Sequence, residues 1–483
     1  MKVAASGISH KTKKSSFKPI IVDDFRKKIL EGLKKNSAEI KPEDVDRGVA
    51  FRALEPVDAA NPAKPEEAGW TFLINKKDSL GEQIIEAIHP LARYRGMDGV
   101  DSPLIFNDTP EEFWGKWIDK YLLLRKGEHK QPPKYVLIIG GPNSIPIEFQ
   151  SRLSNEAFVG RIDFDDVKQV KAYAEKVKGI EESDKAFVNK EVAFFATDHG
   201  ISNSGVCYYP THFSRFDVEK ELVPNVDRLN KGFKPNPLIE ADATKQNLRK
   251  SIQDSKPCLV YASSWGMFAP GESMDLQKKI TGAICCQGDP EKVSYKDLLL
   301  TADDISSDAP FLEGGVFFQH SSFSYGAPAV SDLNQWISEA EKWEIPKQIA
   351  PTDFVAALPK KLVFHPKGPL AFIGHFDEVL SYTYALGEDS HEEARPERLQ
   401  PISKTIEHLL LGRPVGFALG DMNQRYHGLS IELADLSAKL NKKNKSGAEK
   451  EKEPDQLKRL SDLFLQWYEA KNYMIFGDPA VRL

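Results

Sequence analysis

The chain has 483 residues, which is more than one hydrophobic core usually serves, so two α/β lobes or one large elaborated domain are expected. Its net charge of −6 gives no electrostatic reason to expect nucleic acid as a partner. No run of about 18 apolar residues occurs, and residues 1–20 lack the apolar core of a signal peptide. We therefore expect a cytoplasmic protein that does not contact a membrane.

The cysteine pattern argues against both a disulfide scaffold and a zinc site. Four cysteines in a chain of this length are too few for a disulfide framework, which agrees with a reducing compartment. Two of them are adjacent and no Cys-x-x-Cys pair exists. The Gly-Gly pair at 140–141 also lacks the spacing of a nucleotide loop. We therefore predict neither a metal nor a cofactor. The cysteines are Cys207, Cys258, Cys285 and Cys286.

Hydrophobic periodicity divides the chain into three parts. Residues 1–55 are predicted to form an arm and a helix, with 1–20 flexible or loosely docked and 21–35 helical. Residues 56–187 are predicted to form a smaller α/β lobe, and 188–483 the larger lobe. The lysine- and glutamate-rich run 441–455 is predicted to be a solvated loop between two helices.

Short, nearly continuous apolar runs alternate with segments of helix length. This alternation predicts a mostly parallel sheet with helices on both faces. The predicted strands are 70–74, 135–139, 159–162, 192–196, 257–262, 316–318, 370–373 and a last one near 473. The predicted helices are 21–35, 81–93, 110–124, 165–182, one that begins at Asp242 as its capping residue, and 457–470.

Polar side chains follow several of these strands. In parallel sheets, ligands bind beyond the carboxyl ends of the strands, so these positions predict a site. The stretch 313–328 is the most informative, because its buried strand opens into a loop of small hydroxyl residues in which Ser324 occupies the place of a nucleophile. The residues at strand ends are His199, Ser263, Ser264, Trp265, Ser322, Ser324 and His375.

A set of motifs in this order resembles the gingipain-type family of cysteine peptidases in the caspase-like clan. The resemblance covers roughly residues 66–483 and is to the bacterial cytoplasmic branch rather than the secreted enzymes. The motifs are 135–150 (YVLIIGGPNSIPIEFQ), 158–164 (FVGRIDF), 262–267 (ASSWGM), 281–287 (TGAICCQ), 302–304 (ADD), 317–328 (FFQHSSFSYGAP), 373–375 (IGH) and 477–483 (GDPAVRL).

The resemblance implies a caspase-like α/β/α sandwich with a mostly parallel sheet, preceded by a smaller α/β lobe, and peptide hydrolysis by a Cys nucleophile and a His base. The chain departs from the family at both catalytic positions. Trp265, with Ser264 beside it, stands at the His position. Ser324 stands at the Cys position, with Ser322 as the alternative if the alignment slips. Neither an indole nor a hydroxyl exchanges protons near neutral pH as imidazole does.

A serine nucleophile here needs a base from elsewhere in the chain. His375 ends the following predicted strand and could approach Ser324 from the side. His320 faces the same way as Ser324 but lies more than about 10 Å away along a continuous strand. The alternative is that Ser324 is a polar loop residue beside packed histidines.

The resemblance also implies a substrate-binding wall. For the cysteines in it, buried structural thiols are the competing interpretation. For the two aspartates, the alternatives are a cation site or a helix cap. The residues of this wall are Cys285, Cys286, Gln287, Asp303 and Asp304.

Three hypotheses follow. The first is a catalytically degenerate caspase-like protein, regulatory or protein-binding, that holds a peptide or protein partner in the strand-end groove. The second is a peptidase, in which Ser324 either replaces an original Cys or works with another base. The third is an unrelated α/β enzyme or nucleotide binder that shares only the fold.

Overall fold

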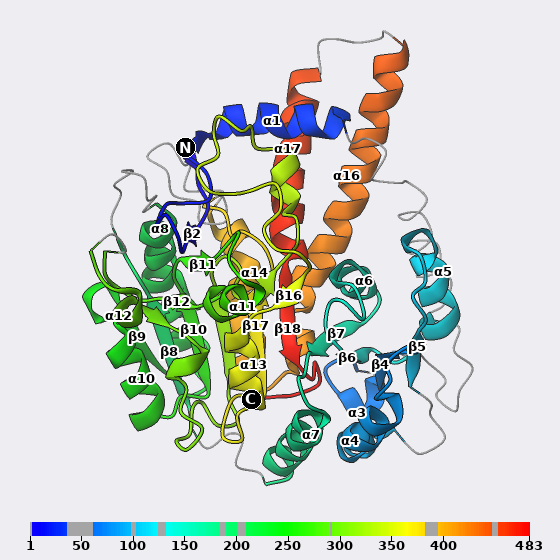
Figure 1. Cartoon of the computed structure of the whole chain (residues 1–483), viewed down its shortest axis with the longest axis vertical. Coiled ribbons are helices and arrows are strands. Elements are labelled where there is room, and N and C mark those ends of the chain that lie inside the picture. The colour runs from blue at the N-terminus through cyan, green and yellow to red at the C-terminus, as the bar shows by residue number, and fades with distance from the viewer. Residues whose placement is uncertain are drawn as a thin grey trace.

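The computed structural model describes residues 2–35, 61–97, 103–123, 132–183, 189–199, 209–289, 292–381, 395–446 and 453–483. A ten-stranded sheet forms the centre of this part of the chain (Figure 1). Eight of the nine strand pairings in the sheet are parallel, and only β17 and β18 are antiparallel. The predicted α/β fold with a mostly parallel sheet is confirmed. The strands, in spatial order, are β5 (Leu104–Phe106), β4 (Trp70–Asn75), β6 (Tyr135–Ile139), β7 (Phe158–Ile162), β18 (Tyr473–Gly477), β17 (Ala371–His375), β14 (Val316–His320), β10 (Leu259–Ser263), β8 (Glu191–Ala196) and β9 (Lys234–Ile239).

The sheet runs without interruption through both predicted lobes. The strand that joins them is β18, which lies between β7 and β17. Four strands before residue 187 form one side of the sheet, and five strands after it form the other. The lobe boundary at 187 stays a prediction, but the two parts share one sheet.

Helices cover both faces of the sheet because alternate side chains of each strand point to opposite sides. On β6, Tyr135, Leu137 and Ile139 pack in the core that contains α4 (Gly81–Tyr94) and α7 (Val167–Glu182). Val136 and Ile138 pack on the other side with α5 (Trp114–Ile118) and α6 (Ile147–Leu153). A strand covered in this way must be apolar at every position, as the sequence of β6 is.

Most of the predicted helices are confirmed, among them those at 21–35 and 457–470. The helix expected from Asp242 begins later, because Thr244 caps it by accepting from the main-chain N–H of Asn247 (3.1 Å). The predicted charged loop is shorter than expected, since α16 and α17 extend into both its ends; residues 447–452 lie outside the described residues. These helices are α1 (Val22–Lys35), α3 (Pro65–Ala68), α8 (Tyr209–Asp217), α9 (Val223–Arg228), α10 (Lys245–Asp254), α11 (Met274–Ile280), α12 (Tyr295–Leu298), α13 (Ala357–Phe364), α14 (Arg395–Leu410), α15 (Val415–Ala418), α16 (Gly420–Ser446) and α17 (Glu453–Lys471).

The prediction of a flexible or loosely docked arm at residues 1–20 is wrong. The side chains of residues 3–9 are buried, and β2 (Gly7–Ser9) pairs in parallel with β11 (Gly266–Phe268). This pair belongs to a second, four-stranded sheet completed by β12 (Ile284–Cys285) and β13 (Leu299–Leu300). The arm then leads into α1, which lies across α17 (Figure 1). A strand of three residues is too short for its periodicity to show in the sequence.

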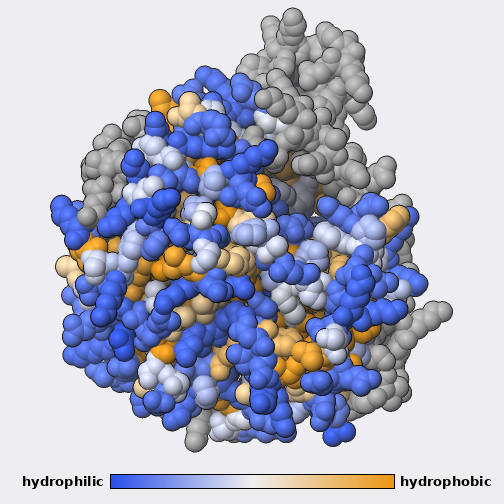
Figure 2. Space-filling model, in the orientation of Figure 1, coloured by the Kyte–Doolittle hydropathy of each residue, from blue (hydrophilic) through white to orange (hydrophobic). Residues whose placement is uncertain are grey.

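The surface in the view of Figure 2 is mostly hydrophilic. Hydrophobic residues on this face lie in small patches separated by polar ones. Scattered apolar residues of this kind are normal for a folded surface. Among the helices of the described residues, none has the length and apolar character that crossing a membrane requires.

A buried ion cluster fixes the turn after β18. Arg95 Nε donates to Asp478 Oδ2 (2.9 Å), and its two Nη atoms donate to the Glu181 carboxylate (2.6 and 2.9 Å). Trp70 Nε1 donates to the second oxygen of Asp478 (2.8 Å). The cluster therefore ties α4, α7 and β4 to the turn that follows the strand joining both sides of the sheet.

We expect Arg95→Ala to lower the free energy of unfolding by about 3 kcal/mol, because it leaves Asp478 buried without its cation. Urea unfolding followed by circular dichroism measures the change. The matched control is Arg482→Ala, which removes a largely exposed pair with Glu66 (3.2 Å) and should change stability by no more than about 0.5 kcal/mol. Equal losses in the two variants would contradict the role given to the buried cluster.

Candidate functional site

The structure brings most of the predicted strand-end residues to one edge of the sheet. Strands β10, β14 and β17 are adjacent and parallel, so their carboxyl ends lie side by side. Ser264 and Trp265 follow β10, Ser322 and Ser324 follow β14, and His375 is the last residue of β17. The residues therefore lie at one edge of the sheet, and their role there depends on the contacts described below.

Ser324 is fully buried and bonds only to the main chain. Its hydroxyl donates to the carbonyl of Gln319 (3.0 Å) and accepts from the main-chain N–H of His375 (2.8 Å). In the described part of the chain, neither hydrogen bond of Ser324 Oγ involves an imidazole. Both the proton and an oxygen lone pair are thus used to close the loop onto the neighbouring strand.

The two nearby histidine rings are engaged elsewhere. His375 Nδ1 donates to the carbonyl of Asp377 (2.8 Å), and its ring packs edge-on against Tyr473. The His320 ring lies parallel to Tyr473 and its Nδ1 bonds to that residue's hydroxyl. Burial lowers the pKa of His375 to about 4 and that of His320 to about 3. Both rings are therefore neutral near pH 7.

Ser322, the alternative nucleophile position, is part of a buried polar network. Its hydroxyl donates to Glu378 Oε2 (2.9 Å) and accepts from the main-chain N–H of Val379 (2.9 Å). Ser6, from the arm, lies 2.8 Å from it, oxygen to oxygen. Ser16 completes the network by bonding to the other oxygen of Glu378. The side chains of Ser6, Ser16, Ser322 and Glu378 are all buried. The network therefore links the arm to the ends of β14 and β17 inside the core.

Glu378 is held in its protonated form. The pKa of its carboxyl is raised to about 8, chiefly by burial and also by the neighbouring Asp377, against the opposing effect of the Ser16 and Ser322 hydroxyls. A neutral carboxyl fits the contacts, because Oε1–H can donate to Ser16, whose own hydroxyl lies 3.3 Å from the carbonyl of Gly7. The carboxyl therefore acts as a structural hydrogen-bonding group at neutral pH.

Three glycines pack closely against Ser322, Ser324 and Glu378. A Cβ on Gly266 would lie 1.7 Å from the Ser322 carbonyl oxygen, and one on Gly374 would lie 3.1 Å from Ser324 Oγ. A Cβ on Gly7 would lie 2.4 Å from Glu378 Oε2. A methyl group does not fit at these points without a shift of its neighbours, and both serine side chains are fully buried.

The residues that the sequence resemblance aligns with a catalytic His, Trp265 and Ser264, are also packed inside the structure. Trp265 is fully buried and stacks on the His199 ring, with centroids 3.9 Å apart and planes 16° from parallel. Ser264 donates to the carbonyl of Trp265 (2.9 Å). His199 Nδ1 contacts Thr211 Oγ1 (3.3 Å), and burial lowers the pKa of this histidine to about 4. The indole thus fills the space beside β11 and packs an imidazole against its face.

The residues of the predicted binding wall have structural partners. Burial raises the pKa of the Cys286 thiol to about 12 and also raises that of Cys285, so both are inert thiols. Asp304 caps a helical turn through Thr301 and pairs with Lys245 (2.6 Å), while Asp303 pairs with Lys279. The Gln287 side chain makes two hydrogen bonds to the main chain of Asp198. It accepts from the N–H (2.9 Å) and donates to the carbonyl (2.5 Å).

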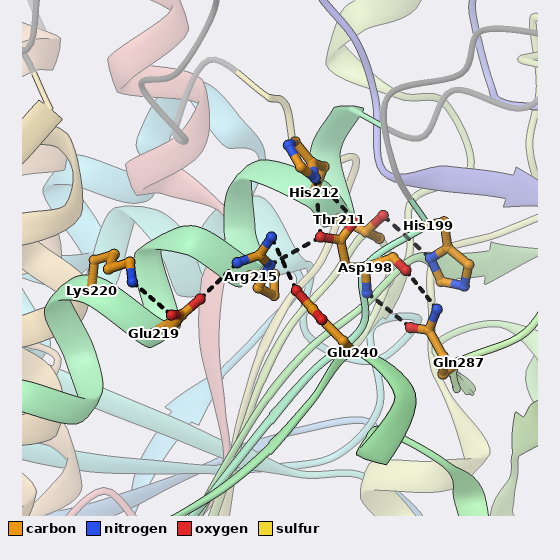
Figure 3. Close-up of polar contacts among 9 residues, drawn as sticks. All are labelled: Asp198, His199, Thr211, His212, Arg215, Glu219, Lys220, Glu240 and Gln287. Atoms are coloured by element: carbon orange, nitrogen blue, oxygen red, sulfur yellow. Dashed lines mark hydrogen bonds and ion pairs between the residues drawn. The ribbon is translucent and has the colours of Figure 1, made fainter.

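Beyond Gln287 lies a charged cluster that the sequence did not reveal (Figure 3). Asp198, just after β8, accepts from Arg215 Nε (2.9 Å) and lies 3.0 Å from His212 Nδ1, both on α8. Arg215 also pairs with Glu219 (2.6 Å) and Glu240 (3.1 Å). The cluster fastens α8 to the ends of β8 and β9. His212 and Arg215 are one helical turn apart, which is the only signal that the sequence offers for it.

The structure also shows site residues that sequence reasoning missed. Asp377 and Glu378 follow the predicted strand ending near His375, and two acids at a strand end could have been noticed. Ser6, Gly7 and Ser16 could not, because their neighbours are remote in the sequence. Among the described residues, no group of three or more His, Cys, Asp or Glu side chains could hold a metal ion.

Comparisons with known proteins identify no relative by sequence: no protein-family model and no curated protein matches this chain. Solved structures do match it, and two of them are described here. The crystal structure of the Arg-specific cysteine proteinase gingipain R has a TM-score of 0.45 and 12% identity, covering 88% of this chain and 80% of that chain. A structure described as a protease has a TM-score of 0.44 and 10% identity, covering 86% and 78%. The strand pairings themselves establish the α/β fold, and membership of the gingipain-type family stays a prediction.

The raised pKa of Glu378 predicts a pH-dependent stability difference. The folded carboxyl keeps its proton up to about pH 8, whereas an unfolded one loses it near pH 4.5. Unfolding therefore releases a proton between these values, and the stability of the folded protein falls as pH rises through them. Glu378→Gln keeps a neutral side chain, so we expect its stability relative to the unchanged protein to rise by about 3 kcal/mol between pH 5 and pH 8.

Urea unfolding at several pH values measures this difference. Glu66→Gln, an exposed carboxyl paired with Arg482, is the matched control and should track the unchanged protein across the range. If the stability of Glu378→Gln also stayed parallel to that of the unchanged protein at every pH, Glu378 would be ionised in the folded protein. The assignment of a proton to its carboxyl would then be wrong.

Proposed function

We propose that this chain is a catalytically degenerate caspase-like protein of the gingipain type, without peptidase activity, that acts by binding a peptide or protein. The observation that carries this proposal is the environment of Ser324. Its hydroxyl stands at the family's Cys position, is fully buried and bonds to two main-chain groups. A serine in this state has no base to remove its proton and no substrate to attack.

The chemistry of the His position supports the same proposal. An indole N–H cannot take a proton from a nucleophile and return it to a leaving group near neutral pH. The imidazole that Trp265 stacks on, that of His199, has its Nδ1 against Thr211 Oγ1. When both members of a catalytic pair are lost, rates typically fall by several powers of ten.

The fixed loops at the strand ends favour a protein that binds a partner over one that has lost all function. A buried network that includes an acid and several hydroxyls stabilises one arrangement only when every partner is present. Such a network holds the loops at the edge of the sheet in fixed positions, which is what a recognition surface needs. Residence in the cytoplasm, and partners other than nucleic acid or membranes, remain predictions from the sequence.

A restored cysteine tests the proposal most directly. We expect Ser324→Cys to remain inactive on a fluorogenic panel with Arg, Lys or Asp at the cleaved position. Position 324 is fully buried, and among the described residues neither hydrogen bond of the Ser324 hydroxyl involves an imidazole. We also expect its thiol to resist alkylation in the native protein by at least about 100-fold relative to an exposed thiol.

Thr12→Cys, at an exposed position, serves as the matched control for alkylation. Intact mass spectrometry counts adducts against the unchanged protein, whose own cysteines set the background. Turnover by the unchanged protein that Ser324→Ala abolishes would overturn the proposal and establish the alternative, a serine-based peptidase.

A further inference from the structure

The arm occupies a groove between two extended segments, as a bound peptide would. On one side, Ser6 accepts from the main-chain N–H of Gly266 (2.8 Å), and His10 donates to the carbonyl of Phe268 (2.8 Å). On the other side, Ser6 donates through its main-chain N–H to the carbonyl of Val379 (2.9 Å). Ala4 accepts from the main-chain N–H of Ser381 (2.7 Å) on that side as well. Peptides that add as a strand to an exposed edge are held by main-chain hydrogen bonds of this kind.

The groove fits small side chains. Ala4, Ala5, Ser6 and Gly7 fill its centre, and all of them are buried. Gly7 passes so close to Glu378 that a Cβ would lie 2.4 Å from the carboxyl oxygen. On either side of this narrow part, Val3 and Ile8 enter separate apolar clusters, the second of which contains Trp265. A peptide that fits the groove therefore has, in order, an apolar residue, three small residues, a glycine and a second apolar residue.

The arm enters this groove from an exposed basic turn. Ile8 and Ser15 face each other across a hairpin, closed by the bond from the Ser9 main-chain N–H to the Lys14 carbonyl (2.9 Å). At its tip, Lys11, Thr12 and Lys14 are exposed. Exposed turns are where chains are cut most readily. One cut at this tip would convert residues 3–9 from a tethered strand into a separate peptide.

We propose that the groove between β11 and Val379–Ser381 is a binding site for extended peptides of small residues, and that residues 3–9 are its resident intramolecular ligand, exchangeable once the turn at residues 11–14 is cut. This inference rests on the proposed function, because it supplies the binding surface of a protein without peptidase activity. While the turn is intact, the tether gives the arm a local concentration of the order of millimolar, which outcompetes a free peptide.

The test uses the full chain with the recognition sequence of a site-specific protease inserted between Thr12 and Lys13. The probe is a fluorescent peptide of the arm, Lys-Val-Ala-Ala-Ser-Gly-Ile-Ser-His, followed by fluorescence anisotropy. We expect the cut protein to exchange its resident segment for the probe, and the uncut protein to bind the probe at least about 100-fold more weakly. Mass spectrometry after gel filtration detects the segment that is released.

The matched control is the same peptide with valine in place of its glycine. We expect it to bind the cut protein about 10- to 100-fold more weakly, because the added side chain collides with Glu378. Equal binding of the two peptides would overturn the proposal. So would retention of the resident segment with no entry of the probe, or loss of the circular dichroism signal of the folded protein on cutting.

A second variant locates the binding. The hydroxyl oxygens of Ser6 and Ser322 lie 2.8 Å apart, so Ser6→Cys with Ser322→Cys places two sulfurs within reach of a disulfide. Oxidation should block the probe in the cut protein and reduction should restore binding. Unchanged binding after oxidation would place the probe elsewhere and overturn the inference. Hydrolysis of the probe would instead overturn the proposed function, so the two failures are distinguishable.

Discussion

The buried carboxyl of Glu378 is the interaction on which the strand-end region depends. A carboxyl deprived of water is stable only when it is neutral or fully bonded, and here it is both. Its partners come from two distant parts of the chain: the arm hairpin, with Ser16 and the main chain around Gly7, and the loop after β14, with Ser322. Because removing any partner would leave a buried polar group unsatisfied, the arm and both strand ends form one cooperative unit.

This network explains why the serines have a structural role despite their position. Whether a hydroxyl acts as a nucleophile depends on its access and its base, and not on its place in a motif. The hydrogen bond from Ser324 to Gln319 closes the loop on its own strand, while the bond it accepts from His375 joins the loop to the next one. The same contacts that give the edge of the sheet its rigidity exclude a substrate from these two positions.

The sequence predicted what depends on local pattern and missed what depends on distant neighbours. The fully covered strand β6 was predicted with its observed bounds, because a strand buried on both faces is apolar throughout. The edge strand β9 was missed, since Pro235 and Pro237 argue against a strand except at an edge. The arm was predicted to be loose because chain termini often are. The arm is buried beside the carboxyl of Glu378. That residue is so distant in the sequence that no local pattern could predict its contact with Gly7.

The close packing around Gly7 makes the proposed groove selective. A wide cleft would admit many side chains and would rely on a few pockets for specificity, whereas main-chain bonding on both sides favours any extended peptide that fits. The fit is decided where Gly7 meets Glu378, because even one methyl group there must displace a carboxyl bonded on both oxygens. The close packing of the serine positions and the presence of an internal strand are thus linked physically. With Trp265 filling the space beside β11, the edge can pair with a strand more readily than it can hold a scissile bond.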